Sequence, residues 1–359
     1  MTKATKEARS RLELTKYLFQ IKMKAEYNIL GPKAVQPYQC SIKLTENCQS
    51  RCITCNYWKN KYEDLITTER AIKLLNEDLP EAGINSLRFT GGEPLLRKDF
   101  FEILSALNTD LYNDIILQTN GLLLRRYAKE INDSPITNIC VSLDGLADTN
   151  DRIRGIKGGF NMIIEGLSHI SRKKITVVST LHNRLGKEIE QLITFFKERG
   201  YGWDINLPDS NMYFFKGLDL VDISTMTGEE IDRIVFLLAK YGNYSPKTLS
   251  YIKNYLEKSP HKKENSNAFR CYLGFITTYI NSTGDLLSGC YVMKPMGNIL
   301  AKSVKEIIST DDYEKRVMMM LSKKCPGCTC GFKLNMTLDN LYDSLYFRSY
   351  KKLKRLVSM

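Results

Sequence analysis

The stretch SIKLTENCQSRCITCNYW, residues 41–58, contains a short strand pattern followed at once by three cysteines. Cys48, Cys52 and Cys55 lie within eight residues, although the whole chain of 359 residues has only ten cysteines. The spacing is Cys-x3-Cys-x2-Cys, and no fourth cysteine lies beside it. Because clustered thiolates are typical metal ligands, we expect a site with three protein ligands on a loop that follows a strand.

Two kinds of metal site use thiolates in this way. Zinc takes four ligands, or three and a water at a catalytic site. The chain's only histidines are far in sequence from these three cysteines, at His169, His182 and His261. An iron–sulfur cubane usually has four thiolates, so three would leave one iron open to a substrate or cofactor. The histidines are also in no recognisable triad context, which disfavours a histidine-based hydrolase.

From Cys40 to about residue 208, short strand patterns alternate with helix patterns. The strand candidates are residues 41–44, 86–90, 115–119, 139–143, 176–181 and 203–207, and the helix candidates between them are 68–78, 98–107, 122–132, 160–171 and 186–198. Such alternation predicts βαβ units with a parallel sheet. Its regularity favours a curved, barrel-like sheet over an open one. The three cysteines would then lie at the carboxyl end of the first strand, where barrel enzymes carry their active sites.

We divide the chain into five parts. These are an N-terminal amphipathic helix and linker (1–37), the barrel (38–225), a helical connection (226–268), a cysteine-rich α+β module (269–335) and a basic C-terminal helix (336–359). Within the module, TTYINSTGDLLSG reads as a β-hairpin, because strand residues flank a polar turn.

The net charge of +12 is concentrated at the two ends of the chain. Residues 1–24 and 348–359 each carry a net +5, which indicates either solvated lysine-rich helices or a basic arm for RNA, an acidic peptide or a membrane surface. No apolar run is long enough to span a membrane, and the N-terminus lacks the pattern of a secretory signal. We therefore predict a cytoplasmic protein whose cysteines serve metal binding or catalysis.

The cysteine spacing and its place after the first strand resemble the radical S-adenosylmethionine (SAM) superfamily, whose signature is Cys-x3-Cys-x-aromatic-Cys. The resemblance implies a partial (β/α)6 TIM-like barrel and a [4Fe–4S] cluster on Cys48, Cys52 and Cys55. It also implies that the open iron binds SAM. Reduction by a donor of flavodoxin or ferredoxin type would then release a 5′-deoxyadenosyl radical, which takes a hydrogen atom from the substrate.

One position departs from the family signature. Thr54 stands where the family has an aromatic residue before the third cysteine. Tyr57 and Trp58, which follow shortly afterwards, are therefore our candidates for the adenine contact.

The second strand candidate ends in RFTGGEP, residues 88–94. A pair of glycines permits close backbone approach, and proline stiffens a turn, so an ordinary βα loop explains the pattern when taken alone. After the cysteine loop, however, it resembles the family's Gly-Gly-Glu-Pro motif. That resemblance implies that Gly91, Gly92, Glu93 and Pro94 bind the amino end of SAM, with the carboxylate facing the ammonium group.

Polar residues also end the third and fourth strand candidates. Asn120 in QTNG, and Ser142 and Asp144 in VSLDG, offer hydrogen bonds to ribose hydroxyls or to the SAM carboxylate, and Arg154 in DRIRG offers a charge-assisted bond to a carboxylate. The alternative is turn chemistry and exposed arginines. The run SLDGLADTNDRIRGIKGGF resembles the subgroup that carries an extra iron–sulfur module.

The cysteine-rich module contains Cys271, Cys290, Cys325, Cys328 and Cys330. From the residues alone, a structural zinc site and an iron–sulfur site are equally good interpretations. The spacing resembles the SPASM/twitch extension, which implies one auxiliary [4Fe–4S] cluster on the first four. This leaves Cys330 outside the ligand set. The alternatives for it are a substitute ligand, a catalytic thiol that returns a hydrogen atom to a substrate radical, or no role.

We therefore predict a radical SAM oxidoreductase or maturase that acts on an unactivated C–H bond of a peptide or small biosynthetic intermediate. Oxidation or epimerisation aided by the auxiliary cluster would follow. One alternative is modification of RNA or a nucleoside, which the basic ends suggest. The other is a non-enzymatic protein that uses its cysteines for electron transfer or as a zinc scaffold.

Overall fold

The computed structural model describes residues 36–59, 63–207, 226–242, 244–257, 271–291, 293–322, 324–325 and 332. The two predicted terminal helices, with their basic charge, lie outside the described residues, and so do Cys328 and Cys330. No helix in the described ranges is long and apolar enough to cross a membrane.

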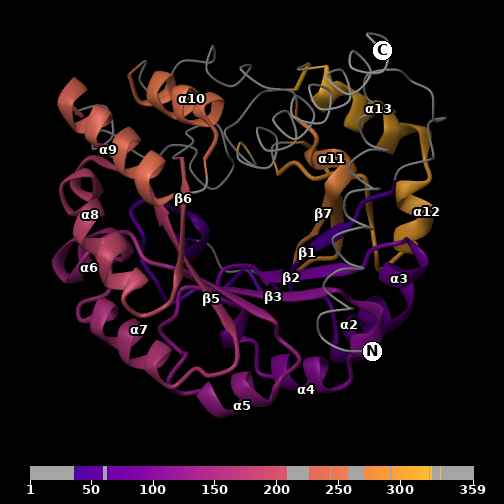
Figure 1. Cartoon of the computed structure of the whole chain (residues 1–359). Helices are drawn as coiled ribbons and strands as arrows, with labels where there is room; N and C mark the ends of the chain where they lie inside the picture. The colour runs from indigo at the N-terminus through magenta and orange to yellow at the C-terminus, as the bar shows by residue number, and fades with distance from the viewer. Residues whose placement is uncertain are drawn as a thin grey trace, which may run out of the picture.

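A nine-stranded sheet organises the described residues, with the strand order β6-β5-β4-β3-β2-β1-β7-β8-β9. Its parallel part consists of β1 (Gln39–Lys43), β2 (Ser86–Thr90), β3 (Asp114–Thr119), β4 (Asn138–Ser142), β5 (Lys174–Thr180) and β6 (Gly202–Asn206). These six strands pair in chain order. Since β6 and β9 remain edges of the described sheet, the barrel is partial, which confirms the predicted fold class (Figure 1).

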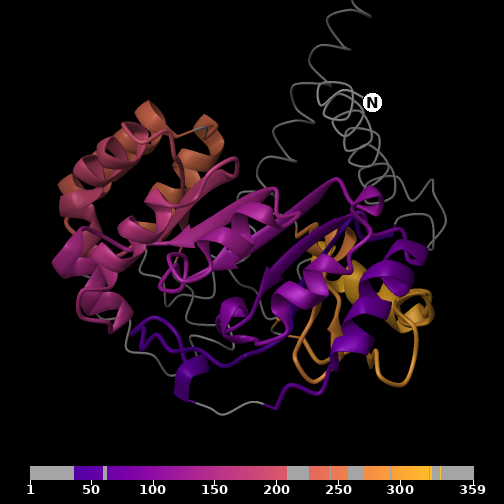
Figure 2. The same ribbon diagram turned by 90° about the horizontal axis from the view of Figure 1, so that it is seen from below.

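Helices cover the outer face of the curved sheet (Figures 1 and 2). Between the strands lie α2 (Thr68–Lys73), which continues through the π-helical η2 (Leu74–Asp78) into α3 (Leu79–Glu81), then α4 (Phe100–Ser105), α5 (Ala128–Asp133), α6 (Ala147–Arg154), α7 (Gly159–Ser168) and α8 (Asn183–Lys197). Single 3-10 turns are η1 (Tyr57–Lys59), η3 (Pro94–Leu96) and η4 (Thr109–Leu111). Ile42, Phe89 and Val141 are fully buried in the resulting core.

Within the barrel, two helical segments differ from the sequence prediction. The helix predicted over 122–132 begins only at Ala128, because the side chains of Thr119 and Asn120 accept hydrogen bonds from the backbone N–H groups of Gly121 and Leu122 and hold the chain in turns. Helix α6 was not predicted at all. Its sequence ADTNDRIR buries one apolar side chain, Ile153, so the hydrophobic spacing that reveals other helices is absent.

The C-terminal part continues the barrel sheet. After α9 (Gly228–Tyr241) and α10 (Pro246–Glu257) come α11 (Leu273–Ile276), β7 (Thr277–Ile280), β8 (Asp285–Leu287), β9 (Gly297–Asn298), α12 (Val304–Ile308) and α13 (Asp311–Leu321). The predicted hairpin is present as the antiparallel pair β7 and β8. Strand β7 also pairs in parallel with β1, which brings the hairpin beside the strand that leads into the cysteines (Figure 1).

Candidate functional site

The cysteine loop, residues 44–58, leaves the carboxyl end of β1. Cys52 is buried, Cys48 and Cys55 are half-buried, and none of the three forms a disulfide. Burial raises the pKa of Cys48 to about 11 and also raises the pKa values of Cys52 and Cys55. These thiols therefore stay protonated at neutral pH unless a cation compensates for desolvation, as a bound metal does when it deprotonates its thiol ligand.

Hydrogen-bond donors lie close to two of these sulfur atoms. The Asn120 side-chain amide is 3.7 Å from Cys48 Sγ, and Arg154 Nη1 is 3.9 Å from Cys52 Sγ. The indole N–H of Trp58 donates to the carbonyl of Cys52 at 3.0 Å. Donors of this kind stabilise a thiolate and orient it towards a metal, so the loop has outer partners in place.

The glycines of RFTGGEP lie directly against the cysteine loop. The N–H groups of Gly92 and Glu93 donate to the carbonyls of Thr45 and Asn47, at 3.2 and 2.8 Å. A Cβ atom at Gly92 would lie 2.2 Å from the Asn47 carbonyl oxygen, and one at Gly91 would lie 2.1 Å from that of Thr45. The close approach expected of these glycines is thus an approach to the protein's own loop, and their contact with SAM stays a prediction.

Glu93 is completely buried and joins the ends of β2 and β3. Its Oε1 accepts hydrogen bonds from the N–H of Leu95 at 3.2 Å and from the hydroxyl of Thr119 at 2.7 Å, and its Oε2 accepts from the N–H of Asn120 at 2.7 Å. Burial raises the pKa of Glu93 to about 7, against the opposing effect of these hydrogen bonds. Pro94 follows as the first residue of η3.

Helix α6 holds the other side of the cysteine loop. The N–H groups of Arg51 and Ile53 donate to carbonyls at the end of α6, at 3.0 and 2.9 Å. Arg154 Nε lies 2.7 Å from Asp144 Oδ2, and Asp144 is fully buried. Although burial opposes it, the neighbouring Asp144 carboxylate raises the pKa of Arg154 above its ordinary value. Arg154 thus links a buried carboxylate to a cysteine of the loop.

Several predicted site residues meet here, and others do not. The structure brings Glu93, Asn120, Asp144 and Arg154 to the cysteine loop through the contacts above. Ser142 is the half-buried last residue of β4. The roles of all five towards SAM stay predictions.

The two aromatic candidates after Thr54 differ in their surroundings. Trp58 lies against the loop and contacts the Arg51 guanidinium, 5.4 Å from its ring centre. Tyr57 is buried and accepts a hydrogen bond from the Lys43 ammonium. The adenine contact of either residue stays a prediction.

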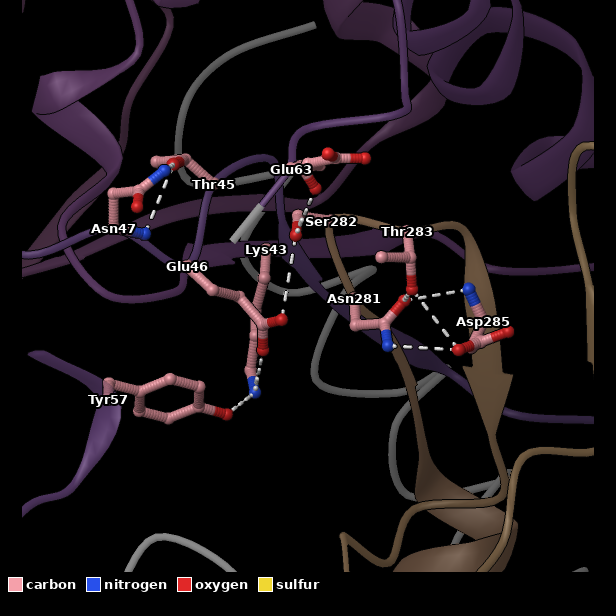
Figure 3. Close-up of polar contacts among 10 residues, drawn as sticks. All are labelled: Lys43, Thr45, Glu46, Asn47, Tyr57, Glu63, Asn281, Ser282, Thr283 and Asp285. Carbon is pink, nitrogen blue, oxygen red and sulfur yellow. Dashed lines mark hydrogen bonds and ion pairs between the residues drawn. The ribbon is translucent and has the colours of Figure 1, made fainter. Parts of the chain in front are cut away.

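Lys43 is a residue that sequence reasoning missed. It is 4% exposed, and its Nζ lies 3.1 Å from Glu46 Oε1 and close to the hydroxyl of Tyr57 (Figure 3). The same Nζ lies 4.5 and 4.4 Å from the ring centres of Tyr57 and Tyr291. Burial lowers its pKa to about 8, although Glu46 opposes the shift. A lysine inside a strand pattern that borders a cysteine motif is a usable signal, because lysines are rarely buried without a partner.

The second cysteine group is only partly within the described residues. Cys290 is buried, Cys271 and Cys325 are half-buried, and none of them forms a disulfide. Among the described residues, which include Cys48, Cys52 and Cys55 but not Cys328, no three His, Cys, Asp or Glu side chains lie close enough to share one metal ion. In a cubane each thiolate binds a different iron, so this finding concerns sites with a single metal ion. The auxiliary cluster on Cys271, Cys290, Cys325 and Cys328, and the role of Cys330, therefore stay predictions.

Sequence comparison identifies relatives of the barrel. The chain is 36% identical over 138 residues to an Fe-coproporphyrin III synthase of Methanosarcina barkeri, which covers 37% of this chain and 34% of that protein. It is 32% identical over 201 residues to a probable GTP 3′,8-cyclase of Archaeoglobus fulgidus, which covers 52% of this chain and 64% of that protein. The chain thus spans less than two thirds of the length of these curated relatives.

Solved structures share the fold at low sequence identity. Streptococcus suis SuiB bound to its precursor peptide SuiA has a TM-score of 0.61 at 15% identity, covering 86% of this chain and 72% of SuiB. Native anSMEcpe with bound AdoMet has a TM-score of 0.57 at 18% identity, covering 84% and 88%. The family model of the radical SAM superfamily matches residues 42–198, from β1 to the end of α8. This match contains the three cysteines and the strands β2 to β5, which is the part of the chain where the cysteine spacing predicted this family.

Proposed function

We propose that this protein is a radical SAM enzyme in which Cys48, Cys52 and Cys55 hold a [4Fe–4S] cluster. One observation carries the proposal. Three free thiols lie on one loop at the carboxyl end of β1, and N–H donors of Asn120 and Arg154 lie near two of their sulfur atoms. This donor set fits the group, because three protein thiolates leave one iron for SAM.

Such a cluster supplies the electron that cleaves bound SAM to methionine and a 5′-deoxyadenosyl radical. The protein's own residues shape the place where this happens. Gly92 and Glu93 hold the first half of the cysteine loop through its backbone, and α6 holds the second half. Arg154 supplies positive charge beside Cys52 and is itself fixed by Asp144, so Asp144 acts on the site through Arg154. Gly91, Pro94, Asn120 and Ser142 complete the proposed SAM surface.

For the reaction, we propose hydrogen abstraction from an unactivated C–H bond of a peptide or small biosynthetic intermediate, followed by oxidation or epimerisation. The structures that share this fold include SuiB bound to a precursor peptide, which supports a peptide substrate. We also propose an auxiliary [4Fe–4S] cluster on Cys271, Cys290, Cys325 and Cys328. In an oxidation it would accept the electron that the substrate radical loses after hydrogen abstraction. In an epimerisation, Cys330 would return the hydrogen atom.

A nucleotide substrate is the second candidate, and one observation favours it. Several relatives, among them that of Archaeoglobus fulgidus, are named as GTP 3′,8-cyclases. Incubation of the reconstituted protein with SAM, reductant and GTP distinguishes the two. Consumption of GTP coupled to 5′-deoxyadenosine would favour the nucleotide, whereas unchanged GTP beside SAM cleavage would favour the peptide or small intermediate.

The decisive experiment is anaerobic reconstitution, iron counting, and incubation with dithionite and SAM. We expect about eight irons per chain, since each cubane holds four, and release of 5′-deoxyadenosine. Cys52→Ala should abolish that release. Cys140→Ala is the matched control, because Cys140 is also a free, half-buried cysteine but lies in β4. Equal release of 5′-deoxyadenosine from Cys52→Ala and the parent would refute the proposal. A count of about four irons per chain would refute the assignment of an auxiliary cluster.

A further inference from the structure

Lys43 occupies the junction between the cysteine loop and the C-terminal hairpin. It is the last residue of β1, which pairs with β2 on one side and with β7 of the hairpin on the other. Its ammonium donates to the hydroxyl of Tyr57, two residues after Cys55, and lies 4.4 Å from the ring centre of Tyr291, the residue after Cys290. Lys43 therefore contacts a residue close in sequence to each of the two cysteine groups.

Glu46 balances this charge from within the cysteine loop. Its Oε1 is 3.1 Å from Lys43 Nζ, and both side chains are almost completely excluded from solvent. The hydroxyl of Ser282 lies 3.5 Å from Glu46 Oε2 and 3.2 Å from the carbonyl oxygen of Glu63, so these two acceptors share one hydroxyl hydrogen (Figure 3). The pair is thus fixed from the barrel side and from the hairpin side.

A buried ion pair of this kind needs an explanation beyond stability. Desolvation of the two charges costs about as much as their attraction returns, so apolar side chains of similar volume would stabilise the fold equally well. Both charges contact the loop that holds the predicted cluster ligands, since Glu46 precedes Cys48 by two residues and Tyr57, to which Lys43 donates, follows Cys55 by two residues. In a site from which water is excluded, such charges act strongly on their neighbours.

We propose that Lys43 and Glu46 set the reduction potential of the iron–sulfur cluster that Cys55 would ligate, and that Tyr291 of the hairpin strengthens this effect by covering Lys43. The inference rests on the proposed function. A positive charge near a cluster stabilises its reduced, more negative form, and a negative charge destabilises it. Lys43 therefore raises the potential and Glu46 lowers it.

The test is a redox titration at pH 7, followed by electron paramagnetic resonance, of reconstituted parent and variants. We expect Lys43→Met to shift the potential of the SAM-binding cluster to more negative values and Glu46→Gln to shift it to more positive values. Each change should be about tenfold in the reduction equilibrium, or about 59 mV for one electron. Tyr291→Ala should shift the potential in the same direction as Lys43→Met, because water then screens the ammonium.

The matched control is Lys129→Met, which removes an exposed lysine paired with Asp133 and should leave the potential unchanged. Shifts of the reduction potential in opposite directions for Lys43→Met and Glu46→Gln support an electrostatic role. Distortion of the loop alone would not give shifts that follow the sign of the charge removed. If Lys43→Met fails to fold, the positive shift of Glu46→Gln carries the test. If the parent cleaves SAM and the variants have the same potential as the parent, this inference alone is overturned. If the parent holds no cluster, the proposed function is overturned as well.

Discussion

Gly92→Ala tests whether the glycine pair exists to seat the cysteine loop. Gly92 does not have the left-handed φ that favours glycine, so backbone conformation gives alanine no penalty there. The lack of space does penalise alanine, because the new Cβ atom would lie 2.2 Å from the carbonyl oxygen of Asn47 and 2.3 Å from that of Glu46. Both obstacles are backbone atoms of the loop, which cannot rotate away as a flexible side chain can.

The magnitude follows from the contacts that must be relieved. Restoring ordinary van der Waals separation moves the two backbones apart by about 1 Å or more, which weakens the hydrogen bonds from Gly92 and Glu93 to the loop. Overpacking costs about 1–3 kcal/mol and each hydrogen bond about 0.5–1.5 kcal/mol. We therefore expect the free energy of unfolding to fall by about 2–6 kcal/mol.

Urea denaturation of the iron-free protein measures this change, and iron counting after reconstitution shows whether the displaced loop still loads. Gly228→Ala is the matched control, because a Cβ atom there meets nothing within 4 Å at the exposed start of α9. Its stability should stay within about 1 kcal/mol of the parent's. The steric reasoning is refuted if Gly92→Ala unfolds at the same urea concentration as Gly228→Ala and binds as much iron.

Three further predictions concern the groups around the loop. Asp144→Ala leaves the Arg154 guanidinium buried without its carboxylate, so the free energy of unfolding in urea should fall by about 3–5 kcal/mol, whereas Asp133→Ala in an exposed pair should change nothing measurable. The pKa of Glu93 is raised to about 7, so its contribution to stability is present below its unfolded pKa and is lost as pH rises through 7. The free energy of unfolding, measured by denaturation from pH 4 to 8, should therefore fall as pH rises, and Glu93→Gln should reduce this fall by about 3 kcal/mol. The same dependence on pH in Glu93→Gln and the parent would contradict this. Trp58→Phe removes a 3.0 Å hydrogen bond to the loop and should cost about 1 kcal/mol in the same assay, and no loss would show that the bond contributes nothing.

The sequence predicted the fold where local pattern decides it. The second strand was predicted at the observed residues of β2, and the other five parallel strands were predicted within about two residues of their ends, because runs of branched apolar residues between helix patterns mark buried parallel strands. Pairing between distant segments was beyond this reasoning. The hairpin was predicted, but not its place beside β1, because the preference of β7 for that edge depends on the assembled sheet.

The site was predictable as a set of residues and not as a set of contacts. Cysteine spacing located the loop, and RFTGGEP located a close backbone approach. The structure shows this approach towards the loop, while the contact of the glycines with SAM stays a prediction. Asp144 and Arg154 were predicted to contact SAM, and that stays a prediction. The sequence pattern shows neither their ion pair nor the helix that lies between them. Lys43 was missed because its burial results from the hairpin packed over β1.

The way the loop is held explains how the family fold tolerates Thr54. The glycine turn grips the carbonyls of Thr45 and Asn47, and the carbonyls at the end of α6 accept from the N–H groups of Arg51 and Ile53. All four contacts are made by the loop's backbone, which every residue type supplies. The path of the chain through the three cysteines is therefore independent of the side chain at Thr54. Other side chains of the loop do hold it, as the hydrogen bond from Trp58 to the carbonyl of Cys52 shows, so this independence applies to Thr54 and not to the loop as a whole.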